Sequence, residues 1–140
     1  MSRCFLLASM LVIASAPTWA NDLKPGQWEM TMSMEGEHLP SQLSQERTRR
    51  MCMSESETAD MAVTMRERWQ GAGCDDINVT RDDNIIEAQA SCDHGGKATS
   101  IDGQATLHSD EHFTSQIVVT NDTVVTTHHE ARWVSSDCEA

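Results

Sequence analysis

The chain has 140 residues, of which 22 are Asp or Glu and 10 are Lys or Arg, so its formal net charge at pH 7 is −12. Phosphate groups and anionic headgroups repel such a chain, which argues against nucleic acid or an anionic membrane surface as its partner. The same charge is compatible with cations or basic partners, and the length fits a single domain.

The first residues have the pattern of a secretory signal peptide. Arg3 precedes an apolar run over residues 5–16, and a short segment after it ends in a small residue, Ala20. This order predicts cleavage between Ala20 and Asn21, and export of residues 21–140 to the periplasm or the medium. The run is shorter than the roughly 20 apolar residues that cross a bilayer, and no second run follows, so we expect no membrane span.

Strict alternation of apolar and polar side chains predicts a half-buried strand over Trp28–Met34. Its methionines also resemble a set of soft copper(I) ligands. Trp28 continues the same apolar face and is no copper ligand, so we interpret this face as core. A second strand is expected over Gln45–Met53.

A single helix is predicted over Ser54–Gln70. Ser54 and Glu57 fit a capping box at its start, and glycines follow its end. An apolar stripe recurs every four residues, and we expect it to pack on the Trp28–Met34 face. The stripe consists of Met61, Met65 and Trp69.

The rest of the chain has the pattern of short strands joined by tight turns. The sequence therefore predicts a mainly β (α+β) domain, an antiparallel meander that forms a curved sheet, sandwich or small barrel, with one α-helix after the second strand. The remaining strands are expected at Cys74–Thr80, Asn84–Cys92, Thr99–His108, His112–Thr120 and Thr123–Val134.

Four cysteines follow the predicted cleavage site, and an even number in an exported chain predicts two disulfides. They lack the C-x2-C spacing typical of a zinc site. Four cysteines allow three connectivities. A three-residue loop over 82–84, with Asn84 left-handed, would place Cys74 opposite Cys92. We therefore favour the pairs Cys74–Cys92 and Cys52–Cys138.

The apolar pattern of the same hairpin favours a different register, in which Ile77 pairs with Ala88 and Val79 with Ile86. The two registers conflict, because a slip of one residue moves every side chain to the other face. A bulge near Gly73 would reconcile them.

The residues Lys-Pro-Gly-Gln-Trp-Glu at 24–29 resemble the K-P-G-x-W-E opening of an exported bacterial family called domain of unknown function 3617. The four cysteines are similarly placed to those of that family. Ser136 departs from its pattern, which usually has glycine two residues before the last cysteine. The resemblance implies an envelope location and, because the family carries no assigned activity, no catalytic residues.

The segment His108–His112 has the letters H-x-x-E-H of an inverted zinc-protease motif, with Glu111 as the base. That motif needs a helix, whereas the pattern here is strand, turn, strand, so a metal-dependent hydrolase is only a remote alternative. In a three-residue hairpin loop over 109–111, His108 and His112 would be cross-strand neighbours about 5 Å apart. Two such rings could hold Zn²⁺ or Cu²⁺, which makes an envelope metal buffer the alternative function.

The sequence contains no recognisable Ser-His-Asp set, phosphate-binding loop or C-x2-C redox pair. We therefore expect no enzyme and no cofactor. A curved sheet with a methionine-rich face adapts to varied ligands. The leading hypothesis is a non-enzymatic periplasmic or secreted module that binds a small apolar ligand or an envelope protein.

Overall fold

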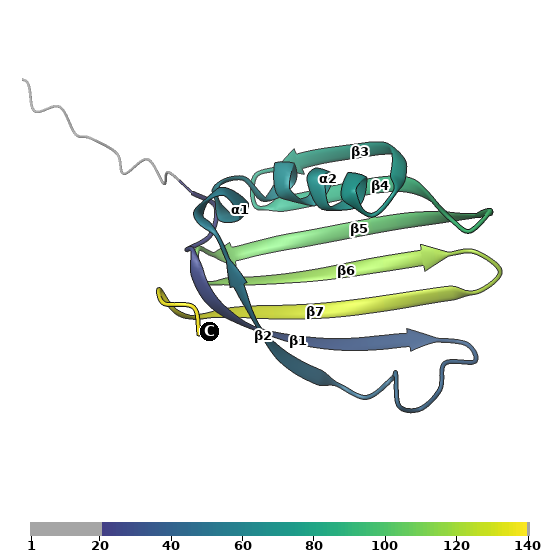
Figure 1. The fold of residues 1–140 in the computed structure, drawn as a ribbon, viewed down its shortest axis with the longest axis horizontal. Helices are drawn as coiled ribbons and strands as arrows, with labels where there is room; N and C mark the ends of the chain where they lie inside the picture. Colours follow the sequence, from purple (N-terminus) through teal and green to yellow (C-terminus); the bar gives the residue numbers. More distant parts are fainter. Residues whose placement is uncertain (1–20, 140) are drawn as a thin grey trace, which may run out of the picture.

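The computed structural model describes residues 21–139 except for the side chain of His94, so the predicted signal peptide lies outside the described residues. Seven antiparallel strands form one open, curved sheet, and two short helices lie on one of its faces (Figure 1). The mainly β prediction is confirmed, including the position of the helical segment after the second strand. Of the three sheet forms considered, the open curved sheet is the one observed.

The predicted strands are all present, and their ends lie within two residues of the prediction. The helices α1 (Glu55–Ala59) and α2 (Met61–Gly71) lie between β2 and β3. In the described part of the chain, neither helix is long and apolar enough to cross a bilayer. The strands are β1 (Gly26–Gly36), β2 (Arg47–Met53), β3 (Cys74–Asp82), β4 (Ile85–His94), β5 (Lys97–Ser109), β6 (His112–Thr120) and β7 (Val124–Ser135).

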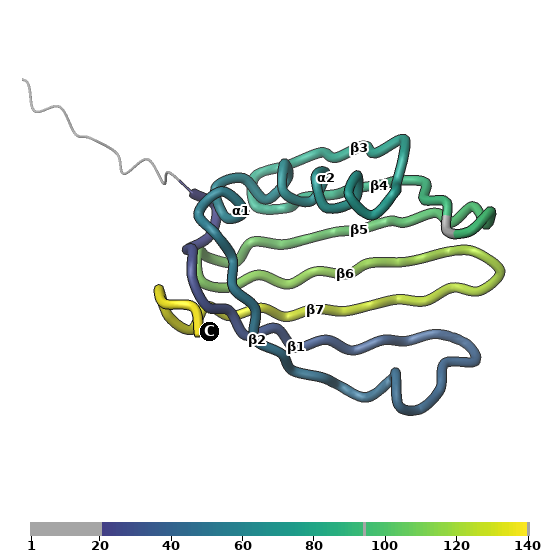
Figure 2. The backbone as a smooth tube through the Cα atoms, in the orientation of Figure 1, coloured from purple at the N-terminus to yellow at the C-terminus, as the bar shows by residue number. Residues whose placement is uncertain are grey.

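The order of strands across the sheet is β2-β1-β7-β6-β5-β4-β3. Strands β3 to β7 follow one another as a meander, whereas β1 lies between β2 and β7 (Figure 2). The first strand of the domain therefore pairs with the last one. In this pairing Met30 lies opposite Ala131, and Met32 lies opposite His129.

The helical segment is two helices and not the single one predicted. Asp60 interrupts it with extended backbone (φ −144°), and its carboxylate accepts hydrogen bonds from the N–H groups of Ala62 and Val63. An aspartate in this position caps a new helix more favourably than it continues an old one. The predicted capping box of Ser54 and Glu57 is confirmed at the start of α1.

The β3–β4 hairpin turns through Asp83 and Asn84 alone, and Asp83, not Asn84, has the positive φ of 53°. The register near the turn therefore matches neither alternative, and the predicted pairings of Ile77 and Val79 are wrong. The observed pairs are Val79 with Ala88 and Arg81 with Ile86.

Cys74 nevertheless lies directly opposite Cys92, because the register shifts between Asp75 and Asn78. Asp76, inside this irregularity, has a φ of 51°. The bulge therefore exists, but it lies within β3 and not near Gly73. Both expected disulfides are present, with Cα atoms 3.9 Å apart in Cys74–Cys92 and 5.6 Å apart in Cys52–Cys138.

The main core lies between the helices and the face of the sheet that they cover, which we call the helix-bearing face. Trp28 is fully buried, lies 5.6 Å from Phe113 between ring centroids, and donates from Nε1 to the Lys24 carbonyl at 2.9 Å. Met61 belongs to this cluster and Met65 packs against it, so the expected contact with the apolar residues of β1 is confirmed in part, although the backbone of α2 lies mainly over β3 and β4. Trp69, the third member of the predicted stripe, packs instead on a separate cluster around the Cys74–Cys92 disulfide.

Candidate functional site: a groove between helix α2 and the sheet

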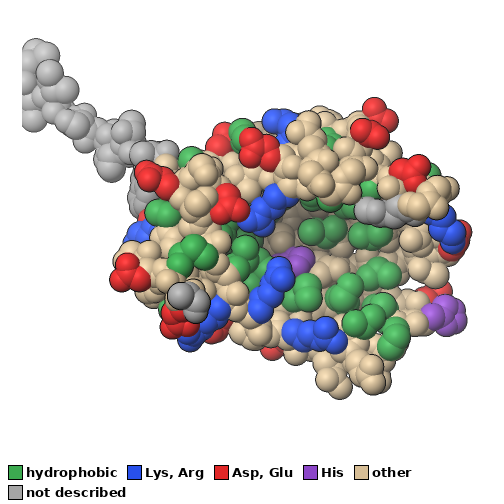
Figure 3. All heavy atoms as spheres, viewed as in Figure 1, with side chains coloured by type: hydrophobic (Ala, Val, Ile, Leu, Met, Phe, Trp, Pro, Cys, Tyr) green, Lys and Arg blue, Asp and Glu red, His purple; other side chains and the backbone are tan. Residues whose placement is uncertain are grey.

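A groove of about 190 Å³ remains open between α2 and the helix-bearing face of the sheet. Figure 3 shows the hollow on this face, with hydrophobic side chains around it and basic side chains and a histidine beside it. Its lining comes from α2 and from five strands, so only the folded chain creates it. Five methionines contribute to that lining: Met30, Met51, Met53, Met61 and Met65.

The shape of the groove depends on small residues in β5. A Cβ atom at Gly103 would lie only 3.1 Å from the ring of Trp69, so the glycine allows that ring to lie directly on the strand. Ala105 is the next residue of β5 on the same face, and it also lines the groove. Ser115 and Ile117 on β6 complete this wall. The short side chains of β5 therefore leave room that large residues would fill.

The charged residues that line the groove are basic. Arg49 from β2 and Arg68 from α2 lie at it together with His129 from β7, and no carboxylate is among the lining residues. In the described chain Arg68 pairs with Glu57 at 3.1 Å, whereas no ion pair or side-chain hydrogen bond joins Arg49 to another residue. The groove therefore has a local positive character in a protein whose net charge is −12.

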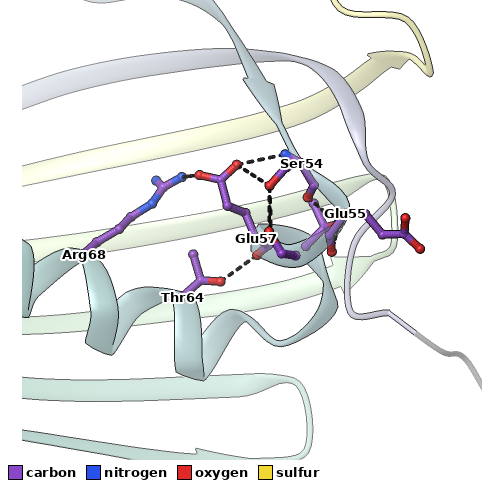
Figure 4. Close-up of polar contacts among 7 residues, drawn as sticks. Ser54, Glu55, Glu57, Thr64 and Arg68 are labelled. Carbon is purple, nitrogen blue, oxygen red and sulfur yellow. Dashed lines mark hydrogen bonds and ion pairs between the residues drawn. The ribbon is translucent and has the colours of Figure 1, made fainter.

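A polar network joins the two helices and positions Arg68 (Figure 4). The Glu57 carboxylate accepts from the Ser54 N–H at 2.8 Å and from the Arg68 guanidinium at 3.1 Å, while the Thr64 hydroxyl donates to the Glu57 carbonyl at 2.7 Å. The hydrogen bonds from Ser54 first, and then Arg68, hold the pKa of Glu57 below its ordinary value. Glu57 is therefore ionised at neutral pH and fixes Arg68 beside the groove.

His129 is half-buried in the wall of the groove, and its Nδ1 lies 3.3 Å from the Ser115 hydroxyl. Burial, then the nearby charges of Arg49 and His128, lower the pKa of His129 below 6.5. Because the folded-state pKa is the lower one, the stability that this residue contributes is present above pH 6.5 and is lost as the pH falls through the folded-state value. The imidazole is neutral at pH 7.

His108 and His112 lie on the opposite face of the sheet, far from the groove lining. Their rings stack with centroids 4.6 Å apart, although the turn is Asp110-Glu111 and not the predicted three-residue loop. The Nε2 atom of His108 is 2.8 Å from the Thr114 hydroxyl, and that of His112 is 3.1 Å from the Glu130 carboxylate. Within residues 21–139 no three His, Cys, Asp or Glu side chains are placed to hold one metal ion. Metal binding by this pair stays a prediction.

Sequence reasoning identified the methionine face but missed the basic residues at the groove. A usable signal was present in β2, where Arg47, Arg49, Met51 and Met53 alternate with residues of the other face. Period-two spacing places these arginines and methionines on one face of the strand. Nothing in the sequence around His129 singles it out from the adjacent His128.

A comparison with models of protein families finds a match, whereas a comparison with curated proteins finds none. The family model described as "Protein of unknown function (DUF3617)" matches residues 23–138, which is the whole sheet together with both disulfides. The resemblance inferred from the tryptophan-containing opening and the four cysteines is thereby confirmed at the level of the family. The chain therefore belongs to the DUF3617 family of proteins of unknown function.

Proposed function

We propose that this protein is a non-enzymatic binding module that takes a small apolar ligand in the groove between α2 and the sheet. The main support for the proposal is the groove itself, which is open, is lined by methionines, has a volume of about 190 Å³ and lies beside the packed core. Methionine side chains are flexible and polarisable, and they adapt to ligands of different shape. Two disulfides are typical of an oxidising compartment, which supports action in the periplasm or outside the cell.

The size of the groove limits the ligand. An apolar cavity of about 150 Å³ in another protein takes one benzene molecule, and drug-sized ligands occupy roughly 300–1,000 Å³. A groove of about 190 Å³ therefore suits a single ring or a short alkyl chain. The opposite face has a wider hollow of about 410 Å³, but exposed polar side chains such as Asn78, Gln104 and Gln116 line it, so it offers little apolar burial.

The polar side chains of the groove are consistent with ligand binding and do not form a complete catalytic set. Ser115 and His129 are adjacent, but a serine nucleophile also needs a third group, usually a carboxylate, that orients the histidine. The lining residues include no carboxylate. We therefore assign the Ser115–His129 pair to the groove wall and not to catalysis.

A neutral probe tests this function directly. We expect 1-octanol to bind at one site of the chain that starts at Asn21, which we call the exported chain. Binding should shift the amide NMR signals of residues that line the groove. Ile117→Trp should fill the groove and weaken binding by about tenfold or more. Gln116→Trp, on the same strand but facing the other way, is the matched control and should bind as the original protein does. Octanol shifts scattered over both faces, or equal binding by the two variants, would show that the groove is not the site; a protein partner would then be the function to test.

The proximity of the His108 and His112 rings, whose centroids are 4.6 Å apart, supports metal binding as a second candidate function. The nitrogen lone pairs of stacked rings point in parallel directions and do not converge on one ion. Chelation therefore requires both rings to rotate and to break their hydrogen bonds to Thr114 and Glu130. If the pair is a metal site, calorimetric titration will show Zn²⁺ or Cu²⁺ binding that His108→Ala/His112→Ala abolishes and His128→Ala retains. Equal heats from all three proteins, or none at submillimolar metal, would remove this function.

A further inference from the structure

Arg49 differs from most of the described basic side chains, including Arg68 at the same groove, in having no carboxylate within ion-pair distance. Within residues 21–139, carboxylates lie within ion-pair distance of many of the basic side chains, but not of Arg49. The paired ones are Lys24, Arg50, Arg68, Arg81, Lys97 and Arg132. Arg47 and Arg66 also have no carboxylate partner in the described chain, but neither of them lines the groove, so Arg49 is the unpaired cation at this site.

Arg49 lies within reach of the groove interior. It is the cross-strand partner of Met30, which is buried in the core, and both residues line the groove. His129 lines the same groove, and the charge of Arg49 adds to the effect of burial in lowering the pKa of that imidazole. One unpaired cation and one neutral imidazole therefore line the methionine-rich groove, and Ser115 adds a hydroxyl.

We infer that the ligand of this groove is an amphipathic monoanion, with a short alkyl chain or single ring on the methionines and its anionic head on Arg49. This inference rests on the proposed apolar-ligand function and adds the chemical class of the ligand. A planar guanidinium holds a carboxylate through two parallel N–H···O hydrogen bonds, so a carboxylate is the head group that fits it best. Arg68 already forms an ion pair with Glu57, so Arg49 is the one cation at the groove that is free to bind a ligand. One free cation matches a ligand with one negative charge.

The competing explanation is that the aliphatic part of Arg49 merely covers apolar surface while its charge stays in water. In that case the charge makes no difference to a ligand, whereas removal of the side chain affects neutral and anionic ligands alike. The two explanations therefore predict different responses of a charged and an uncharged probe with the same alkyl chain.

Octanoate and 1-octanol are such a pair of probes, titrated into the exported chain at neutral pH and low ionic strength and followed by NMR. We expect Arg49→Gln to weaken octanoate binding by roughly fivefold, as befits a solvent-exposed charge pair, and to leave octanol binding within about twofold. Arg50→Gln is the matched control, because it removes the same charge from the same strand on the opposite face, where Arg50 pairs with Glu139. It should leave both affinities unchanged.

The titration of His129 is a second readout that a purely structural role of Arg49 would not move. Bound octanoate should raise the pKa of His129, because an adjacent anion stabilises the imidazolium, and bound octanol should not raise it. Equal octanoate affinity in the original protein and in Arg49→Gln, or equal losses for both probes, would overturn the inference and leave the groove as an apolar site. Failure of both probes to bind the original protein would overturn the proposed function itself.

Discussion

Replacement of both Cys52 and Cys138 by alanine should lower the free energy of unfolding by about 4–5 kcal/mol. The two cysteines are 86 residues apart in sequence, so their disulfide removes much of the conformational freedom of the unfolded chain. Both are exposed in the folded protein, so the substitution loses little packing. Urea unfolding of the two proteins under non-reducing conditions gives the difference.

The Cys74→Ala/Cys92→Ala variant is the natural comparison. Cys74 and Cys92 are 18 residues apart, so losing their disulfide should lower the free energy of unfolding by about 3 kcal/mol through chain entropy alone. Both residues are buried, so lost packing should lower it further. A loss below about 1 kcal/mol in the Cys52/Cys138 variant would contradict the expectation. The segment after β7 would then be held mainly by other contacts, such as Arg50 with Glu139 and the Glu139 N–H with the Gln27 side chain.

Trp28→Ala is the second change with a large expected effect, a loss of about 3–5 kcal/mol in the free energy of unfolding. The indole is fully buried, packs on Phe113 and donates a hydrogen bond to the Lys24 carbonyl. Alanine would therefore leave both a cavity and a carbonyl without its hydrogen-bond donor. A decrease of this size is a large fraction of the stability of an ordinary domain. Chemical denaturation followed by far-UV circular dichroism measures it.

Two further variants separate the contributions of the indole. Trp28→Phe keeps a ring in the core but removes the N–H donor, so we expect a smaller loss of about 1–2 kcal/mol. Trp133→Ala removes the cross-strand neighbour, which is only partly buried, and should cost less than Trp28→Ala. If Trp28→Ala and Trp133→Ala were equally destabilising, burial would not be what sets the importance of Trp28.

The strands were predictable because alternation reports directly which face of a strand is buried. Trp28 and Met30 are buried as the period of two predicts, whereas Met32 and Met34 are only partly buried, like the polar residues between them. The Cys74–Cys92 disulfide was predictable because a short hairpin joins β3 and β4, although the predicted three-residue loop is absent and the bulge at Asp76 brings the two cysteines opposite each other. Cys52–Cys138 then followed as the remaining pair. The family resemblance could be stated from the sequence because the opening motif and the cysteines are local features.

The errors in the prediction come from competition between local preferences. Asp60 can extend one helix or cap the next, and the apolar stripe on either side of it does not reveal which preference wins. In the β3–β4 turn, Asp83 and Asn84 can both adopt positive φ. Asp83 has it in the structure, while Asn84 is hydrogen-bonded to Leu107 of β5. The single irregularity at Asp76 then changes the register of all later pairs in the hairpin.

The groove was not predictable because no local segment contains it. Arg49, Trp69 and His129 come from β2, α2 and β7, and their proximity depends on the insertion of β1 beside β7. The methionine alternation showed that one face is apolar, but it could not show that part of this face stays uncovered. The sequence suggested His108 and His112 instead, because two histidines near one turn are conspicuous in a linear chain.

The position of β1 between β2 and β7 also sets the order in which the chain can assemble. The meander from β3 to β7 grows by adding neighbouring hairpins, each closing a short loop. We expect the N-terminal hairpin to join the sheet after β7 has formed, because β7 is the strand of the meander with which β1 pairs. Pairing between the two ends of a chain raises the contact order and slows folding. We therefore expect Cys74–Cys92 to form before Cys52–Cys138, whose partners are 86 residues apart and come together only when β1 has paired with β7.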